Sequence, residues 1–418
     1  MAEMRCTMLE KVNSYIWGKG LMMLLLLTGA VYTVKTGFVQ FRMFPYIFKR
    51  LRVSKNKRSQ FRTFSMSLGT AMGTGNITGV ASAIGIGGAG AVFWMWISAF
   101  TGMALVYAEN CLSAKYSRKS ICGPMAYIRF GVGSRLLSVV FAVCCLLASF
   151  GMGGMVQINE MANNIGRIAD IPVFFMFTGM FSVIFISISG GSRRISSIAQ
   201  FLLPVATLSY SFLCVSAIIS SECGVPDVFA RIFAEALGIK QVFGGVSGYS
   251  ISKAVSVGIR RGIFSNEAGL GSSPILHSSA ENYRSAETQG MCSMLEVFID
   301  TFLCCTLTAV TLLCTGAQTV YGAFVPVTGK SAEIILAAQM SVFAFCTVIG
   351  WSYCGMRAFS YIFGRCPMIF YFLFSAAAAS GAVFRTGELW ILSDIFNGLM
   401  AFANIFALLY LAKDVRKE

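Results

Sequence analysis

Long apolar runs separated by short polar segments organise the whole chain. No charged residue occurs from position 63 to position 108, a run of 46 residues. Because a helix needs about 20 apolar residues to cross a bilayer, this run is long enough for two crossings joined near Gly87-Gly88-Ala89-Gly90. Similar runs predict eleven membrane-spanning helices in all, at 20–34, 63–88, 91–108, 136–159, 171–192, 195–221, 250–279, 297–316, 334–356, 366–384 and 389–411.

Composition supports an all-α polytopic membrane protein. Of the 418 residues, 56% are hydrophobic and only 12% are charged, and the mean hydropathy is +0.71. A soluble protein would carry roughly 25% charged residues. The net charge of +15 does not indicate nucleic-acid binding, because the basic residues flank the apolar spans, where they determine topology.

Lysine and arginine are distributed unequally between the two sides of the predicted membrane. The loops on one side, which include 38–62 and the tail 412–418, hold 21 of these residues, whereas the other side holds 9. The side richer in basic residues is cytoplasmic as a rule. We therefore expect the C-terminus in the cytoplasm and the N-terminus outside.

The spans also divide into two equal sets. Residues 1–62 provide an N-terminal membrane helix and a basic cytoplasmic loop, and ten spans remain after it. Five fall in 63–221 and five in 250–411, with an extracellular loop at 222–249 between them and a cytoplasmic tail at 412–418. Because each set has an odd number of spans, the two halves run in opposite directions, which is the condition for an inverted repeat.

The first span of the first half contains a stretch that a helix disfavours. Within seven positions, Gly73, Gly75 and Gly79 each cost about 1 kcal/mol relative to alanine, and the intervening threonines and Asn76 compete for backbone hydrogen bonds. An unwound segment at membrane depth marks a binding site where it lines a cavity. The alternative is close helix packing, because Gly75 and Gly79 form a small-xxx-small pair.

The first span of the second half is also interrupted, over 260–274. Two broken helices at matching positions favour a transporter, since their half-helix ends suit a small zwitterion together with a cation. This segment carries Arg260, Arg261 and Glu267, which are costly at this depth unless they are paired or hydrated. Either these residues contact the substrate or they form an internal ion pair, for which Glu109 and Asp300 are further candidates.

Enzyme chemistry is not predicted. The chain contains neither a G-x-S-x-G nor an H-E-x-x-H motif, and its only histidine is His277. The 14 cysteines fall mostly in apolar runs, without paired metal-ligand spacing, and are interpreted as small buried side chains.

Several blocks of sequence resemble the alanine or glycine:cation symporters, a family of bacterial sodium:alanine symporters with the leucine-transporter (LeuT) type of fold. The blocks extend from about residue 37 to residue 364, and the clearest are Gly73-Thr74-Gly75-Asn76-Ile77-Thr78-Gly79-Val80-Ala81, Phe93-Trp94-Met95-Trp96, Arg261-Gly262-Ile263-Phe264-Ser265-Asn266-Glu267-Ala268-Gly269 and Val297-Phe298-Ile299-Asp300-Thr301.

The resemblance implies sodium-coupled symport of alanine or glycine across the bacterial cytoplasmic membrane by alternating access. The expected partners are the small neutral amino acid and the lipid bilayer, and no obligate protein partner is inferred. In this fold the substrate lies between the two broken helices and beside a glutamine of the third core helix. The corresponding substrate-binding residues here are Gly73, Thr74, Gly75, Asn76, Gln157, Phe264, Ser265 and Asn266.

The resemblance also implies a sodium site made of carbonyl groups of the first core helix and side chains of the eighth. These positions correspond to Gly69 and Met72 for carbonyls and to Cys346 and Thr347 for side chains. Cys346 departs from the family, which usually has serine or threonine there, and a thiol is a poor ligand for a hard cation. Proton coupling and a transporter-like amino-acid sensor therefore remain alternatives.

Overall fold

The computed structural model describes residues 2–53, 57–118, 121–238, 247–278, 286–364, 366–384 and 387–415. Within these ranges the chain forms helices and no strand, apart from one isolated bridge between Arg118 and Ile121. The all-α class predicted from the apolar runs is confirmed.

Three helices come before the first interrupted segment. The single span predicted at 20–34 corresponds to the second of them, and helices also form on either side of it. Their bounds are α1 (Ala2–Ile16), α2 (Lys19–Lys35) and α3 (Val39–Val53).

The segment 63–221 contains five groups of helical elements that follow the predicted spans. The first group is interrupted, and the third is one continuous rod with a π-helical segment inside it. The elements are α4 (Lys57–Ala71), η1 (Thr74–Asn76), α5 (Thr78–Gly87), α6 (Gly90–Tyr116), α7 (Pro124–Ala126), η2 (Tyr127–Val132), α8 (Arg135–Phe150), η3 (Gly151–Val156), α9 (Gln157–Ile165), α10 (Val173–Ser189) and α11 (Gly191–Ser220).

The rest of the chain again starts with an interrupted helix after a connecting segment. The π-helical element η4 lies within the continuous rod Ala286–Thr315. The elements are α12 (Val225–Ala236), α13 (Ser247–Asn266), α14 (Ser272–His277), α15 (Ala286–Val297), η4 (Phe298–Cys305), α16 (Thr306–Thr315), α17 (Val320–Thr328), η5 (Gly329–Ser331), α18 (Ala332–Phe363), α19 (Pro367–Ser380), α20 (Gly387–Tyr410) and η6 (Ala412–Asp414).

Several helical elements occupy segments that were predicted as loops, among them α3, α7, α12 and α17. α12 buries Val228, Ile232 and Ala236, which recur every four residues and form one apolar face. This face packs against α6. The prediction failed here because it searched for long apolar runs, and a short helix with one apolar face contains no such run.

Seven helices in the described part of the chain are long and apolar enough to cross a membrane. Two shorter apolar helices, Val173–Ser189 and Pro367–Ser380, coincide with further predicted spans. The remaining two predicted spans are the interrupted ones: α4, α5 and α14 are too short, and α13, although it has 20 residues, is not apolar enough. The protein is thus a multi-pass membrane protein, while the count of eleven crossings and the LeuT-type inverted repeat stay predictions.

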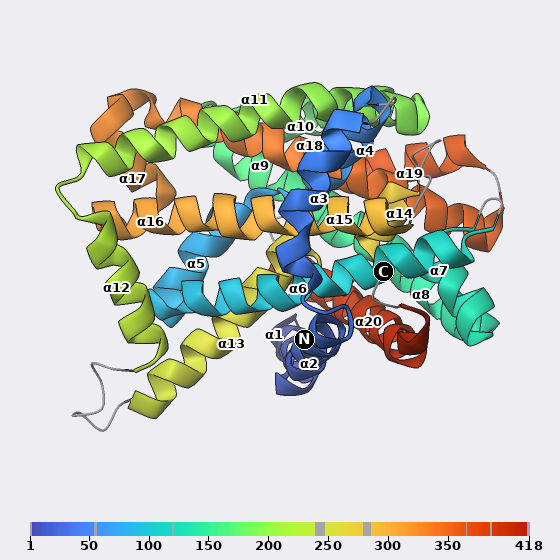
Figure 1. Ribbon diagram of the computed structural model, residues 1–418. Helices are drawn as coiled ribbons and strands as arrows, with labels where there is room; N and C mark the ends of the chain where they lie inside the picture. Colours follow the sequence, from blue (N-terminus) through green and yellow to red (C-terminus); the bar gives the residue numbers. More distant parts are fainter. Residues whose placement is uncertain are drawn as a thin grey trace.

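Helix α6 lies at the centre of the packing and contacts α2, α13 and α15. Figure 1 shows α6, the rod of α15 and α16, and α11 running across the view in similar directions, with α12 at one end. Glycines allow α13 to come close to α6, since a Cβ added at Gly258 would lie 2.3 Å from the carbonyl oxygen of Ala91. The second interrupted helix is thereby held directly against the central one.

Large apolar side chains cover the outer faces of the helices. On α11, Phe201, Leu208 and Phe212 are each more than 70% exposed. Exposed apolar surface of this extent is what a helix needs where it faces lipid.

Candidate functional site

The first interruption frees a backbone carbonyl. Met72 N still donates to Leu68 O, but Gly73 N donates to Ala71 O rather than to Gly69 O. The carbonyl oxygen of Gly69 therefore has no partner one helical turn ahead. It accepts a hydrogen bond from Thr347 Oγ1 at 3.3 Å instead. After the short η1 turn, helix formation resumes at Thr78.

The second interruption is a tight turn between α13 and α14. Glu267 adopts the left-handed conformation with φ of 53°, which is uncommon for a residue other than glycine. Gly269 and Gly271 also have positive φ. The Glu267 carboxylate is held by two donors, Trp351 Nε1 at 2.9 Å and Ser272 Oγ at 2.6 Å. These contacts stabilise a backbone shape that the sequence alone disfavours.

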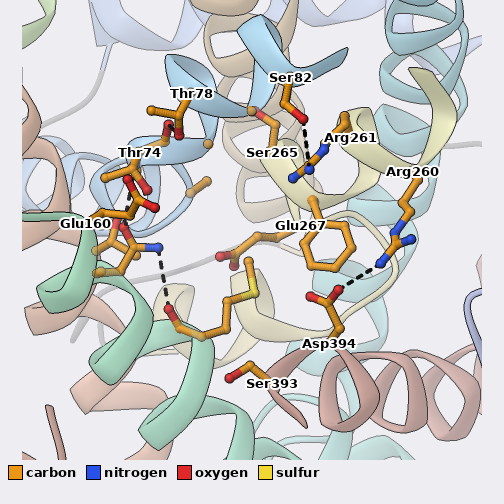
Figure 2. Close-up of a pocket in the computed structure, with 18 of the residues that line it drawn as sticks. Thr74, Thr78, Ser82, Glu160, Arg260, Arg261, Ser265, Glu267, Ser393 and Asp394 are labelled. Atoms are coloured by element: carbon orange, nitrogen blue, oxygen red, sulfur yellow. Dashed lines mark hydrogen bonds and ion pairs between the residues drawn. The ribbon is translucent and has the colours of Figure 1, made fainter. Parts of the chain in front are cut away.

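The two interruptions meet around a cavity of about 460 Å³. Figure 2 shows Thr74, Thr78 and Glu160 on one side of the cavity and Arg260, Arg261 and Asp394 on the other. The cavity volume is in the range typical of small-molecule sites, about 300–1,000 Å³. Of the two half-helix N-termini, that of α5 lines the cavity through Thr78 and Gly79.

Most of the predicted substrate-binding residues line this cavity, namely Gly73, Thr74, Gly75, Gln157, Phe264 and Ser265. Gln157 Oε1 accepts a hydrogen bond from the Thr74 hydroxyl at 3.2 Å, and its Nε2 donates to Met152 O at 3.4 Å. Asn76 and Asn266 lie outside the lining. Asn76 Nδ2 donates to Asp300 Oδ1 at 2.6 Å, and Asn266 Oδ1 accepts from Ala268 N at 3.1 Å.

The residues predicted for the cation lie close together but mostly behind the cavity wall. Thr347 lines the cavity, whereas Gly69, Met72 and Cys346 do not. Cys346 packs on Gly69, because a Cβ added at Gly69 would lie 3.4 Å from Cys346 Cβ. Carbonyl and hydroxyl oxygens suit a monovalent hard cation, so Gly69 O with Thr347 Oγ1 has the right donor chemistry.

The glycines of the first interruption do not form a helix-packing face. A Cβ added at Gly75 or at Gly79 would meet no atom within 4 Å, and both residues line the cavity. The small-xxx-small interpretation is wrong for this pair. Gly73 is different, because a Cβ there would lie 2.9 Å from Thr347 Oγ1 and 3.2 Å from Gln157 Oε1. Close approach of three elements thus requires glycine at position 73.

The acidic partner of Arg260 was not predicted. Arg260 pairs with Asp394 of α20 at 2.8 Å, and Arg261 donates to the Ser82 hydroxyl at 3.2 Å (Figure 2). Within the described ranges neither arginine forms an ion pair with any of the expected acids. A usable signal was present, since Asp394 is the only charged residue of the predicted span 389–411.

The three expected acids have other partners. Glu109 accepts a hydrogen bond from Asn404 Nδ2 at 2.6 Å, and Glu267 is held by Trp351 and Ser272 as described above. Asp300 accepts from Asn76 at 2.6 Å and from Ser265 Oγ at 2.7 Å. Asn76 belongs to the first interruption and Ser265 to the second, so one buried carboxylate ties the two together.

Glu160 and Ser393 also line the cavity without having been predicted. Glu160 follows directly after the predicted span 136–159, at the point where charges begin again. Neither Glu160 nor Ser393 lies in a distinctive sequence motif. Their role at the cavity follows from packing, since α9 and α20 approach it from separate parts of the chain.

An all-helical multi-pass membrane protein with a cavity that holds charged and hydroxyl side chains between two interrupted helices belongs to the class of membrane transporters. Comparison with known proteins agrees with this class and narrows it. The model of the sodium:alanine symporter family matches residues 2–418, and this chain belongs to that family.

Relatives from an archaeon and a bacterium match along nearly the whole chain. The chain is 34% identical over 444 residues to the sodium/alanine symporter AgcS of Methanococcus maripaludis, covering 99% of this chain and 96% of that protein. It is 33% identical over 428 residues to the amino-acid carrier protein AlsT of Bacillus subtilis, with coverage of 97% and 89%. It is also 33% identical over 428 residues to the probable sodium/glutamine symporter GlnT of Bacillus subtilis, with coverage of 96% and 87%.

Proposed function

We propose that this protein couples the uptake of a small neutral amino acid, alanine or glycine, to the inward movement of sodium by alternating access. The observation that carries the proposal is the cavity lined by both interrupted helices. Its walls hold both acidic and basic side chains, which suit the two charged ends of a zwitterion, and the apolar share of the lining leaves room for a short side chain. The family and the relative named as a sodium/alanine symporter point to the same substrate class.

The walls favour one orientation of the substrate. The N-terminus of α5 and the backbone at Gly73, Thr74 and Gly75 offer partial positive charge for the substrate carboxylate. The carboxylates of Glu160 and Glu267 lie in the same lining and favour the ammonium group. Phe264 supplies an apolar surface for a short side chain.

The coupling sodium, as the second transported species, would bind at the freed carbonyl of Gly69 and the hydroxyl of Thr347, with the Met72 carbonyl as a further ligand. Thr347 Oγ1 now donates to Gly69 O, and rotation of this hydroxyl would let both oxygens face a cation. Sodium binding there would fix α4 relative to α18. Cys346, packed on Gly69, contributes little to a hard cation through its thiol.

The decisive experiment is uptake of labelled alanine into proteoliposomes, with an inward sodium gradient and an inward proton gradient imposed separately. Sodium-driven accumulation that competing glycine inhibits would support the proposal. Thr347→Ala should reduce the sodium-driven rate at least tenfold, whereas Thr347→Ser, which keeps the hydroxyl, should retain most of it.

Other outcomes would reject parts of the proposal. Accumulation driven by protons alone would move the coupling role away from Thr347. Binding of alanine without uptake under either gradient would favour a sensor. Inhibition by glutamine but by neither alanine nor glycine would assign the substrate class of the relative named as a glutamine symporter.

A further inference from the structure

A much smaller cavity, into which several polar side chains reach, lies behind the second interruption. Its volume is about 10 Å³, close to what one water molecule occupies. It is separate from the large cavity, yet Glu267 and Ala71 line both. Its other walls combine apolar surface with polar side chains, which are those of Ser67, Asn266, Ser272, Ser273, Ser293 and Glu296.

Two carboxylates therefore face one water-sized space. Glu267 and Glu296 are each about 95% buried. Glu296 Oε2 accepts a hydrogen bond from Ser67 Oγ at 2.7 Å. Within the described ranges, neither carboxylate forms an ion pair with lysine or arginine. Two desolvated like charges without such partners are unfavourable, so the site needs another source of positive charge.

The imidazole of His277 supplies a place for that charge. His277 is fully buried on α14, and its Nε2 lies 2.8 Å from Glu296 Oε1. Histidine is the side chain whose charge ordinarily changes near neutral pH. A proton on Nε2 would convert this contact into an ion pair.

An unpartnered amide indicates that the small cavity holds water. Asn266 Oδ1 accepts from Ala268 N, which fixes the orientation of the amide, and Asn266 Nδ2 is buried without a partner. A water molecule in the cavity would accept from this Nδ2 and donate to the carboxylates. A bare cation would be repelled by the amide hydrogens, so water fits the walls better than a metal ion does.

Among the described residues, the other groups around the small cavity do not neutralise the negative charge of Glu267 and Glu296. Those acting electrostatically on Glu267, or acted on by it, are Glu296, Asp300 and the thiols of Cys145 and Cys354. α14 also packs on α4, α6 and α18, and on α4 the guanidinium of Arg62 donates to Gln200 Oε1 at 3.0 Å. On α6 the buried acid Glu109 is bound by Asn404, and on α18 Arg357 lies over the ring of Tyr353.

We propose that Glu267, Glu296 and His277 together form a proton-binding site, bridged by one water molecule in the small cavity. A proton from the large cavity adds to the Glu267 carboxylate. The bridging water receives this proton while giving one of its own to Glu296, and the proton finally resides between Glu296 Oε1 and His277 Nε2. Only O–H and N–H bonds form or break. The charge that Glu267 presents to the transported solute would then depend on pH, whatever that solute is.

The single histidine makes a direct test feasible. Protein labelled with ¹⁵N-histidine and reconstituted in lipid bilayers would give imidazole resonances from His277 alone. In the wild type, the imidazolium fraction should rise as pH falls from 8 to 5. Glu267→Gln should lower this fraction by about half or more at a given pH, because it removes a negative charge that favours the imidazolium. Glu296→Gln should lower it further.

Glu160→Gln is the matched control, because it removes a carboxylate that lines the large cavity but not the small one. It should leave the His277 signal unchanged. Where Glu267→Gln does not fold, Ser272→Ala removes the hydroxyl donor to Glu267, favours its protonated form and should shift the signal in the same direction. A His277 that stays neutral from pH 5 to 8, or that responds equally to the Glu160 and Glu267 substitutions, would overturn the proposal.

Discussion

At the scale of single residues, the site depends on the missing side chains of glycines as much as on the side chains that line it. Gly73 leaves room for Thr347 and Gln157, two side chains from separate helices. The freed carbonyl of Gly69 exists only because the helix ends at this point. The glycines of the first interruption thus leave space for neighbouring side chains and free a backbone carbonyl as a ligand. Larger residues at these positions would fill that space.

Gly73→Ala should abolish measurable alanine binding while the protein still folds. The added Cβ would lie 2.9 Å from Thr347 Oγ1 and 3.2 Å from Gln157 Oε1, so both side chains would have to move. Isothermal titration calorimetry of purified protein in sodium buffer would measure the loss. Gly85→Ala on α5 is the control, because a Cβ there meets no atom within 4 Å. Equal affinity in the two variants would contradict a site at Gly73.

At the scale of elements, close helix approach decides where the second interruption lies. Gly258 and Gly262 allow α13 to contact α6 through its backbone, since a Cβ at Gly262 would lie 2.0 Å from Ser98 Oγ. The ion pair of Arg260 with Asp394 then joins α13 to α20 beside the cavity. Helices that are distant in sequence are therefore fixed around the cavity by small residues and by one charged contact.

Gly258→Ala should destabilise the protein by about 1–3 kcal/mol, the usual cost of overpacking a close contact. The added Cβ would lie 2.3 Å from the backbone oxygen of Ala91, which cannot rotate away as a side chain could. Thermal unfolding in detergent, followed by loss of the monodisperse peak, would detect the lower midpoint. Gly179→Ala, at an exposed position of α10 with no atom within 4 Å, should not lower the midpoint, and the helix propensity of alanine should raise it slightly.

At the scale of the whole molecule, apolar side chains determine that the protein lies in the membrane, and charged side chains outside the membrane determine its orientation. The apolar outer faces of the helices require a lipid environment. The unequal distribution of lysine and arginine predicts the orientation of the protein, because basic residues are retained on the cytoplasmic side. The internal charges do neither of these things: some line the cavity between the interrupted helices, and others, such as Glu109 and Asp300, are bound by buried amides outside it.

A green fluorescent protein fused after residue 418 should be fluorescent in a bacterial host, because the C-terminus is predicted to be cytoplasmic. Alkaline phosphatase fused at the same position should be inactive, since it needs the oxidising environment outside the cytoplasm. Phosphatase inserted after Ser221, in the predicted external segment 222–249, should be active. The reverse pattern would show that the predicted orientation is inverted.

Much of the fold could be predicted because the bilayer imposes simple rules. Helices such as α6 and α11 appear as apolar runs of sufficient length, and both interruptions appear as glycine-rich stretches inside such runs. The short helix α12 was missed because one apolar face is a weaker signal than a run. Most of the substrate-binding residues that the family blocks indicated, from Gly73 to Ser265, do line the cavity, but they are a minority of its lining residues.

The sequence by itself determined that the chain is helical, lies in a membrane and is interrupted at two matching positions, because hydrophobicity and glycine content act locally. Only the tertiary structure decided the partners of the buried charges. Asp394 was paired with Arg260, and Asp300 with Asn76 and Ser265, by packing between helices more than a hundred residues apart in some cases. The physical reason is that a buried charge is stabilised by whatever donor lies within hydrogen-bond distance, and that distance is set by folding rather than by position in the chain.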